Sequence, residues 1–241
     1  LVERMKEGVE LEDDQKEVIE KLETLFGKEE NGGWKHLESP YEGVKMEIKY
    51  EQQKEGERSI SLGRAEGVID ATAEEVAAWQ FQSCSRERNR AGYSAGDLAR
   101  LVLRKRIERV NETQIATVKR TPIFMHNREF VWRSIWNRNS DGGITLASQN
   151  LDTKVDYGGD NLGSIVRGIG NGMTTVSNIA SVGGVPQCKI VFKQKLDMGG
   201  FLPISLLNKL IPKQLKVVHS MIEHFKRDDE IDRAAVASLA N

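Results

Sequence analysis

The sequence predicts an α+β fold in which a curved antiparallel β-sheet wraps around a long C-terminal α-helix. Six segments with strand-like alternation follow one another between residues 107 and 197, and glycine- and asparagine-rich turns separate them. One long amphipathic helix, residues 206–226, comes after them. An antiparallel sheet of this length needs a cover on one face, and this helix is available to provide it.

The N-terminal part is predicted to begin with a helix over residues 12–26, because apolar residues recur there at helical spacing and Gly27 ends the run. A polar hairpin turn is expected at residues 52–56. The three strand-like segments of this part are residues 34–38, 44–51 and 58–69.

Two helices are predicted next. Thr72, with Glu75 three residues later, is typical of a capping box, and the helix that it starts runs towards Cys84. A charged break is expected at residues 86–90, followed by a second helix over residues 95–104.

The predicted sheet continues through six more strands before the last helix. The strands are expected at residues 107–121, 129–137, 144–152, 163–169, 173–182 and 187–197. Turn signals fall at residues 139–143, 156–161, 170–172 and 183–186. Pro212 lies inside the last helix, so that helix either kinks there or starts afterwards. The chain therefore divides into a helix and linker (1–33), a main domain (34–227) and a tail (228–241) that begins a linker or a further helix.

Composition favours an ordinary folded protein of 241 residues with a formal net charge of −1, which gives no reason to expect nucleic acid as a partner. Residues 86–138 carry thirteen basic and five acidic side chains. Such a segment either orients the protein on an anionic surface or forms a solvated exterior. Two cysteines and no signal peptide favour a reducing, cytoplasmic location. The chain begins at Leu1 without Met, which suggests a piece of a longer protein and leaves a lost targeting segment open.

The segment Arg128-Glu129-Phe130-Val131 resembles the Arg-Asp-Phe-Val strand of START domains, the StAR-related lipid-transfer family. Three further matches come in family order: Gly33-Trp34-Lys35, Val166-Arg167-Gly168, and the loop from Asp197 to Pro203, which is similar to the family's Asp-x-x-Gly-x-Leu-Pro. The resemblance covers about residues 34–227. It implies a helix-grip fold that encloses one apolar tunnel, and a function in lipid transfer or sensing without catalysis or cofactor.

One departure from the family bears on the ligand. Several lipid-transfer members have an arginine six residues after the first arginine of this strand, and here that position is Ser134. The neighbouring Arg133 alternates to the opposite face of the strand. The resemblance therefore implies a sterol or another weakly polar lipid in preference to a phosphatidylcholine.

The predicted cavity wall combines one strand with the last helix. Three side chains share one strand face, and the alternative for the two tryptophans is that they simply fill the core. The predicted wall residues are Trp132, Ser134, Trp136, Leu207, Leu210 and Ile211.

Two glycine-rich loops are predicted to gate the tunnel and to touch a membrane transiently, because glycines permit hinge motion and large apolar side chains can enter a bilayer surface. The alternative is ordinary turns capped by apolar residues. The predicted gate residues are Tyr157, Gly158, Gly199, Gly200, Phe201 and Leu202.

The sequence gives little support for an enzyme. The four histidines lack metal-ligand spacing, and no Gly-x-Ser-x-Gly motif or acid–base pair is present. The Gly168-x-Gly170-x-Gly172 spacing is typical of phosphate loops, but a strand follows it, which favours a glycine-rich hairpin. Two alternatives to lipid binding stay open. One is a helix-grip enzyme of the polyketide cyclase type with Tyr157 or His126 at the tunnel mouth, and the other is a scaffold that binds a protein partner.

Overall fold

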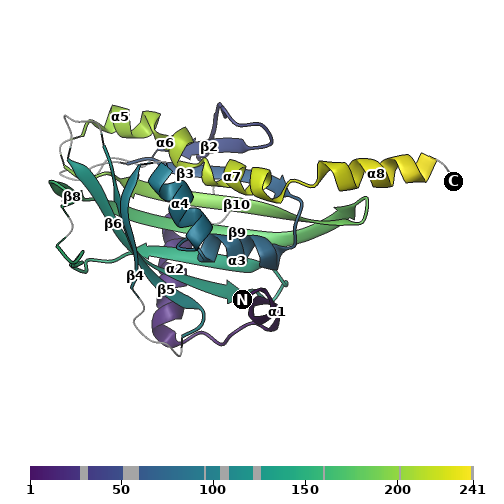
Figure 1. Ribbon diagram of the computed structural model, residues 1–241, viewed down its shortest axis with the longest axis horizontal. Coiled ribbons are helices and arrows are strands. Elements are labelled where there is room, and N and C mark those ends of the chain that lie inside the picture. Colours follow the sequence, from purple (N-terminus) through teal and green to yellow (C-terminus); the bar gives the residue numbers. More distant parts are fainter. Residues whose placement is uncertain are drawn as a thin grey trace.

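The computed structural model describes residues 1–27, 32–50, 60–94, 96–103, 109–121, 126–159, 161–200 and 202–239. The strands are β1 Lys35–Leu37, β2 Lys45–Lys49, β3 Leu62–Ile69, β4 Asp97–Leu103, β5 Glu112–Lys119, β6 Asn127–Arg138, β7 Ile144–Asn150, β8 Ile165–Arg167, β9 Ile169–Val182 and β10 Val185–Asp197. They form one curved sheet in the order β1-β2-β3-β10-β9-β7-β6-β5-β4 (Figure 1). The pairs along this path are antiparallel, and the short β8 pairs in parallel with β6.

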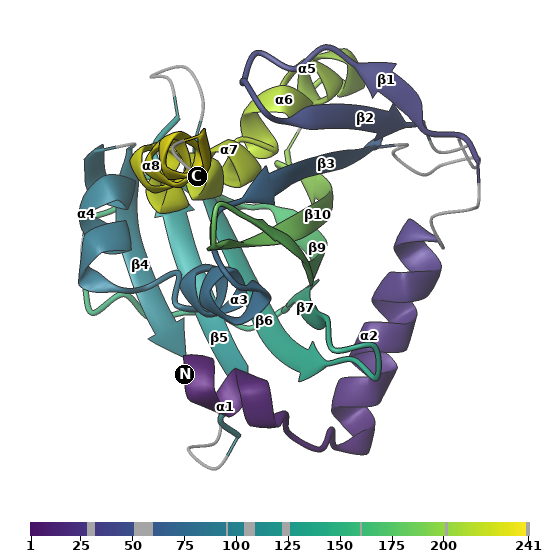
Figure 2. The ribbon, with the colours of Figure 1, turned by 90° about the vertical axis from the view of Figure 1, so that its right-hand side faces the viewer.

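Helices cover both faces of the sheet (Figure 2). The helices are α1 Val2–Glu7, α2 Asp13–Phe26, α3 Ala73–Phe81, α4 Arg86–Ser94, α5 Ile204–Lys209, α6 Ile211–Gln214, α7 Val217–Phe225 and α8 Asp228–Leu239. Helix α2 packs on the outer face, where Leu22 and Phe26 meet Ile135 of β6. Helices α3, α6 and α7 pack on the inner face. The predicted α+β fold, an antiparallel sheet gripping C-terminal helices, is confirmed.

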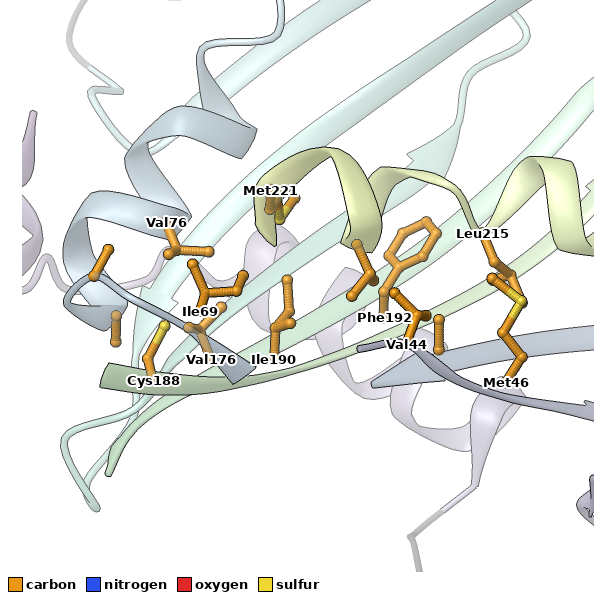
Figure 3. Close-up of a cluster of buried hydrophobic side chains, with 14 of the residues drawn as sticks. Val44, Met46, Ile69, Val76, Val176, Cys188, Ile190, Phe192, Leu215 and Met221 are labelled. Carbon is orange, nitrogen blue, oxygen red and sulfur yellow. The ribbon is translucent and has the colours of Figure 1, made fainter. Parts of the chain in front are cut away.

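The inner-face core explains why the sheet and the C-terminal helices stay together (Figure 3). Met46 of β2 and Phe192 of β10 pack against Leu215 and Met221 from the C-terminal helices. Val76 of α3 joins the same cluster. Burying apolar area contributes about 25 cal/mol per Å², so this cluster is a main source of stability.

Local signals set the boundaries of α2 and α3 as predicted. The Gly27 N–H bonds to the Glu23 carbonyl at the end of α2. Thr72 Oγ1 accepts from the Glu75 N–H at 3.3 Å, while Glu75 Oε2 accepts from the Thr72 N–H at 2.9 Å. These reciprocal bonds satisfy donors that the first helical turn leaves free. The turn predicted at residues 52–56 lies outside the described residues.

The prediction of a second helix over residues 95–104 was wrong. Residues 86–94 form α4, and Asp97–Leu103 forms the edge strand β4, paired with β5 from Asp97↔Lys119 to Leu103↔Gln114. The signal for α4 was Ser85, whose hydroxyl accepts from the Arg88 N–H at 3.3 Å and caps the helix. Pairing with β5 overrides the helical propensity of residues 97–103. The predicted order of two helices between the third and fourth strands still holds.

The single C-terminal helix predicted over residues 206–226 is broken into α5, α6 and α7. Pro212 lies in the first turn of α6, where its missing N–H breaks no helical bond. The tail forms helix α8, and a further helix was one of the two alternatives predicted for it.

The turn predicted at residues 170–172 was also wrong, and so was the glycine-rich hairpin interpretation of that motif. Gly170 and Gly172 lie inside the continuous strand β9, which pairs with β10 along its length. The turn predicted at residues 183–186 is confirmed as the two-residue Gly183-Gly184, where both glycines have positive φ, as tight hairpins require.

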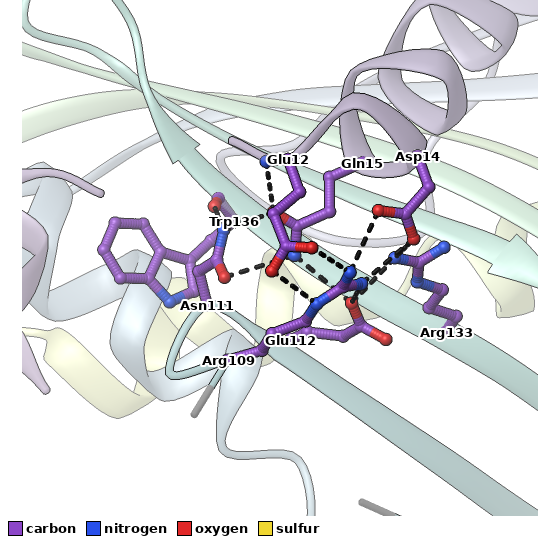
Figure 4. A network of polar contacts seen from close by, with 8 residues as sticks. All are labelled: Glu12, Asp14, Gln15, Arg109, Asn111, Glu112, Arg133 and Trp136. Atoms are coloured by element: carbon purple, nitrogen blue, oxygen red, sulfur yellow. Dashed lines mark hydrogen bonds and ion pairs between the residues drawn. The ribbon is translucent and has the colours of Figure 1, made fainter. Parts of the chain in front are cut away.

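A polar network joins α2 to the outer face of the sheet (Figure 4). Arg133 of β6 donates to Asp14 and Glu112, each at 2.7 Å, and Arg109 bonds both carboxylates and Glu12. Gln15 of α2 also donates to Glu112, at 3.2 Å. Arg133 thus lies on the face opposite Ser134, as the strand alternation predicts. This network fixes α2 against β5 and β6.

Candidate functional site

The inner face of the sheet encloses a cavity of about 180 Å³. Strands β4, β5, β6, β7, β9 and β10 form its floor, and α3, α4 and α7 form its roof. The lining mixes apolar side chains, such as Ile115 and Phe192, with hydroxyl, amide and guanidinium groups.

The floor is built on one row of residues in register across four strands. Ser134 of β6 pairs with Ser148 of β7, Ser148 with Gly172 of β9, and Gly172 with Gln194 of β10. The Ser134 and Ser148 hydroxyl oxygens are 2.8 Å apart. Because paired residues in an antiparallel sheet share a face, all four positions lie along the cavity.

Two glycines of β9 create the hollow above this row. A Cβ atom at Gly172 would lie 3.7 Å from the Phe192 ring and 4.0 Å from the Ser148 Cβ, which is ordinary contact. A Cβ at Gly170 would lie 3.0 Å from Leu196 Cδ1 and 3.6 Å from the Trp132 indole, so the Leu196 side chain would have to shift. A side chain at Gly172 would therefore fill space that is now open. The signal in the sequence was glycine at alternate positions of one strand, which places both on the same face.

Aromatic contacts hold the roof together. The Trp79 ring of α3 lies 5.3 Å from His224 and 6.4 Å from Phe225 of α7, centroid to centroid. His224 Nδ1 lies 3.6 Å from the Glu87 carboxylate of α4. Gln80 joins the roof to the floor, since its Nε2 donates to Thr174 Oγ1 of β9 at 2.8 Å.

Two arginines that sequence analysis did not assign to the cavity line it, Arg88 from α4 and Arg100 from β4. Arg100 donates to Asp97 Oδ2 at 2.7 Å and to the Ser83 carbonyl at 2.6 Å. The Arg88 guanidinium lies 3.9 Å from the centroid of the Trp79 ring. Burial lowers the pKa of Arg88 to about 10, with a further contribution from the nearby charge of Arg100.

The predicted strand residues of the wall divide between the cavity and the core. Trp132 and Ser134 line the cavity. Trp136 shares their face but is fully buried outside the cavity lining, where it packs with Met5 of α1 and Phe81 of α3.

The predicted helix residues of the wall lie outside this lining. Ile211 is buried against the sheet in the inner-face core, Leu207 is also buried, and Leu210 is half-buried. Val217 of α7 reaches the cavity from the C-terminal helices. The breaks between α5, α6 and α7 change which residues face the sheet, and periodicity alone did not reveal them.

The two predicted gate loops meet at β8. Tyr157 Oη donates to Glu129 Oε1 at 2.9 Å, and Glu129 Oε2 bonds Arg167 Nε at 2.7 Å. Burial and this contact with Glu129 raise the pKa of Tyr157. On the other loop, Gly199 has φ +72°, and a Cβ there would lie 2.2 Å from the Arg167 carbonyl oxygen. Only glycine fits this close approach.

The remaining gate residues are less constrained. Gly158 lies in an exposed turn with open space around it, and a Cβ at Gly200 would lie 3.7 Å from Arg128 Nη2. Leu202 is half-buried, and Phe201 lies outside the described residues.

None of the described helices combines the length and the apolar character that a membrane span requires. The described His, Cys, Asp and Glu side chains form no group of three placed to bind a metal ion.

Comparison with known proteins shows similarity in structure. No protein-family model matches the chain, and no curated protein matches it either. Human STARD10 is similar at 17% identity and TM-score 0.62, over 91% of this chain and 83% of that one. Human StAR-related lipid transfer protein 5 is similar at 17% identity and TM-score 0.63, over 88% of this chain and 96% of that one. The human StarD13 (DLC2) lipid transfer and protein localization domain is similar at 15% identity and TM-score 0.62, over 90% of this chain and 99% of that one. With its gripped helices and internal cavity, the chain therefore has the helix-grip fold of StAR-related lipid transfer domains.

Proposed function

We propose that this protein binds one lipid in the cavity on the inner face of its sheet and transfers or senses that lipid without catalysing a reaction on it. The observation that carries the proposal is the hollow above Gly170 and Gly172, roofed by α3, α4 and α7. The solved structures that share this fold include proteins named for lipid transfer, which supports the same function here. Tyr157 is bonded to Glu129 and lies outside the cavity lining, so it does not favour the cyclase alternative.

The size of the cavity requires that it opens to load a lipid. Its volume of about 180 Å³ is below the roughly 300–1,000 Å³ typical of ligand sites. A cavity of about 150 Å³ holds only a molecule the size of benzene. The breaks at Leu210 and between Gln214 and Val217 give the C-terminal segment points at which α5, α6 and the roof helix α7 can shift separately. Loading therefore separates these helices from the sheet.

The two glycine-rich loops are proposed as the gate. Both loops are connected to Arg167 of β8. A movement of Arg167 is transmitted to Tyr157 through the carboxylate of Glu129, and to Gly199 through direct contact with the Arg167 backbone. We expect the gate to touch a membrane transiently, with Leu202 entering the bilayer surface, as a peripheral and cytoplasmic protein does.

Native mass spectrometry of the protein as expressed tests the proposed function. We expect one lipid per chain to survive gentle ionisation and to disappear on denaturation. A chain that arrives empty and takes up neither a fluorescent sterol nor a fluorescent fatty acid contradicts the proposal. An empty chain that captures a protein partner favours the scaffold alternative.

A further inference from the structure

We propose that the lipid carries an acidic headgroup, a carboxylate or a phosphate, and that Arg88 binds this group at the cavity wall. The inference rests on the proposed function and specifies its ligand. The inference depends on the charged side chains that line the cavity. The sequence did not show that these side chains lie close together.

Arg88 makes no ion pair with a described carboxylate, and only the longer-range charge of Glu87 on the same helix partly compensates its own. Within the described chain no Asp or Glu oxygen lies within ion-pair distance of its guanidinium, and its hydrogen bond is to the Trp79 carbonyl, at 2.8 Å. The Trp79 ring holds the guanidinium by stacking at 3.9 Å. A cation held in place without a counter-ion beside a cavity favours an anion there.

Arg100 differs from Arg88 because it has a counter-ion. Asp97 accepts from Arg100 at 2.7 Å, and the exposed Lys119 lies 3.9 Å from the same carboxylate. Arg88, Arg100 and Lys119 therefore have two nearby carboxylates among the described residues, Asp97 and the more distant Glu87, which leaves an excess of positive charge. The excess positive charge disfavours the choline group of a phosphatidylcholine, as Ser134 also implies, but an acidic headgroup replaces the sterol or weakly polar lipid expected from Ser134.

Neighbouring polar groups complete the anion site. Ser83 lines the cavity and lies beside Arg100, which donates to its carbonyl, and its buried hydroxyl has no hydrogen-bond partner within bonding distance in the described structure. This hydroxyl can donate to an anionic oxygen. Gln80 Oε1 and Gln194 Oε1, also buried and unpartnered in the described structure, can accept from a hydroxyl of the ligand. A guanidinium binds carboxylate and phosphate oxygens through parallel N–H donors, which gives both strength and orientation.

A matched pair of ligands tests the headgroup directly. Dodecanoic acid and dodecanol have chains of equal length and differ in the charged group, and their binding can be followed by the fluorescence of Trp79 and Trp132 beside the cavity. We expect the wild-type protein to bind the acid at least about tenfold more tightly than the alcohol, as a charge-assisted hydrogen bond implies. Arg88→Gln should remove this preference and leave dodecanol binding within about twofold. Arg90→Gln is the control, because Arg90 is an exposed arginine of the same helix.

Three further ligands distinguish a lipid headgroup from a free anion as the group that binds Arg88. Monododecyl phosphate should bind like the acid. Inorganic phosphate and acetate alone should compete only at millimolar concentration, because they bury no apolar chain. Inorganic phosphate that binds as tightly as the lipids would instead indicate a site for free anions and overturn the headgroup assignment.

Each outcome decides one of the two proposals. If neither dodecyl ligand nor a fluorescent sterol binds the wild-type protein, the proposed function fails. If the wild-type protein binds the acid no more tightly than the alcohol, lipid binding stands and the role of Arg88 is overturned. This comparison uses only the wild-type protein, so it tests the headgroup assignment even if Arg88→Gln proves unstable. Arg88→Lys, which keeps the charge, should retain part of the preference, whereas equal loss in Arg90→Gln would contradict a specific role for Arg88.

Discussion

Gly63 of β3 faces Ile211 of α6 so closely that a Cβ atom at Gly63 would lie 2.8 Å from Ile211 Cγ2. The Leu215 methyl groups would lie 3.3 Å from the same atom. This contact brings the C-terminal helices down onto the sheet beside Gln194, the β10 residue that pairs with Gly63 and lines the cavity. The absence of a side chain at Gly63 therefore sets how closely α6 approaches the sheet.

Substitution of Gly63 should weaken this packing. We expect Gly63→Ala to lower the free energy of unfolding by about 1–3 kcal/mol, because overpacking forces α6 away from the sheet. Urea denaturation measures the change. Gly32→Ala, at a position with nothing within 4 Å of the added Cβ, is the control and should change stability by less than about 0.5 kcal/mol. Equal stability of the two variants would show that α6 adjusts freely.

Filling the hollow above β9 should block the ligand without unfolding the protein. Gly172→Val adds a branched side chain where the nearest atom, the Lys193 carbonyl oxygen, lies 3.6 Å from the built Cβ. Valine suits a strand, so we expect thermal stability within a few degrees of the wild type. Binding of a fluorescent lipid should fall about tenfold or more. Gly32→Val should bind normally, and normal binding by Gly172→Val would place the lipid elsewhere.

Breaking the polar network under α2 should destabilise the fold. Arg133→Met leaves Glu112, which is buried, with one fewer charged partner, and we expect a loss of about 1.5–3 kcal/mol in the free energy of unfolding. The control is Lys16→Met, which breaks an exposed pair with Asp13 and should cost less than about 1 kcal/mol. Urea unfolding compares the two, and equal losses would contradict a structural role for the buried network.

Acid should loosen the same network. The hydrogen bond from Arg109 holds the pKa of Asp14 at about 2. Burial alone would raise the pKa of Glu112, but hydrogen bonds from Arg133 and Arg109 outweigh it and lower the pKa. A carboxylate whose pKa is lower in the folded state stabilises that state above its unfolded pKa of about 4, and this contribution is lost as pH falls towards 2. Urea midpoints should therefore fall between pH 5 and pH 2.5, and less so in Asp14→Asn. An identical fall in that variant would exclude Asp14 as a contributor.

A charge at the gate loop should slow delivery to membranes. We expect Leu202→Asp to reduce the rate of lipid transfer between vesicles by about tenfold, since a carboxylate disfavours entry into a bilayer surface. Binding of a soluble lipid and thermal stability should be retained. The control is Leu239→Asp, at a leucine of α8 that is 87% exposed. Transfer at the wild-type rate by Leu202→Asp would remove this loop from the gate.

Local chemistry in the sequence was sufficient to predict much of this molecule. The Thr72–Glu75 capping box, the end of α2 at Gly27 and the opposite faces of Arg133 and Ser134 all follow from interactions between residues close along the chain. The regular alternation of β6 also placed Trp132 and Ser134 together on one face. Such signals act within one turn or one strand and need no knowledge of distant neighbours.

The long-range features required the folded structure. Residues 97–103 became a strand because the edge of β5 was free to pair with them, which no local pattern indicates. Gly170 and Gly172 are strand residues that open a cavity because β9 lies between β7 and β10. Arg88 and Arg100 meet at that cavity from a helix and an edge strand that the sequence had assigned otherwise. Sheet pairing and helix packing join residues far apart in the chain, and for that reason the chemistry of the cavity depends on tertiary contacts.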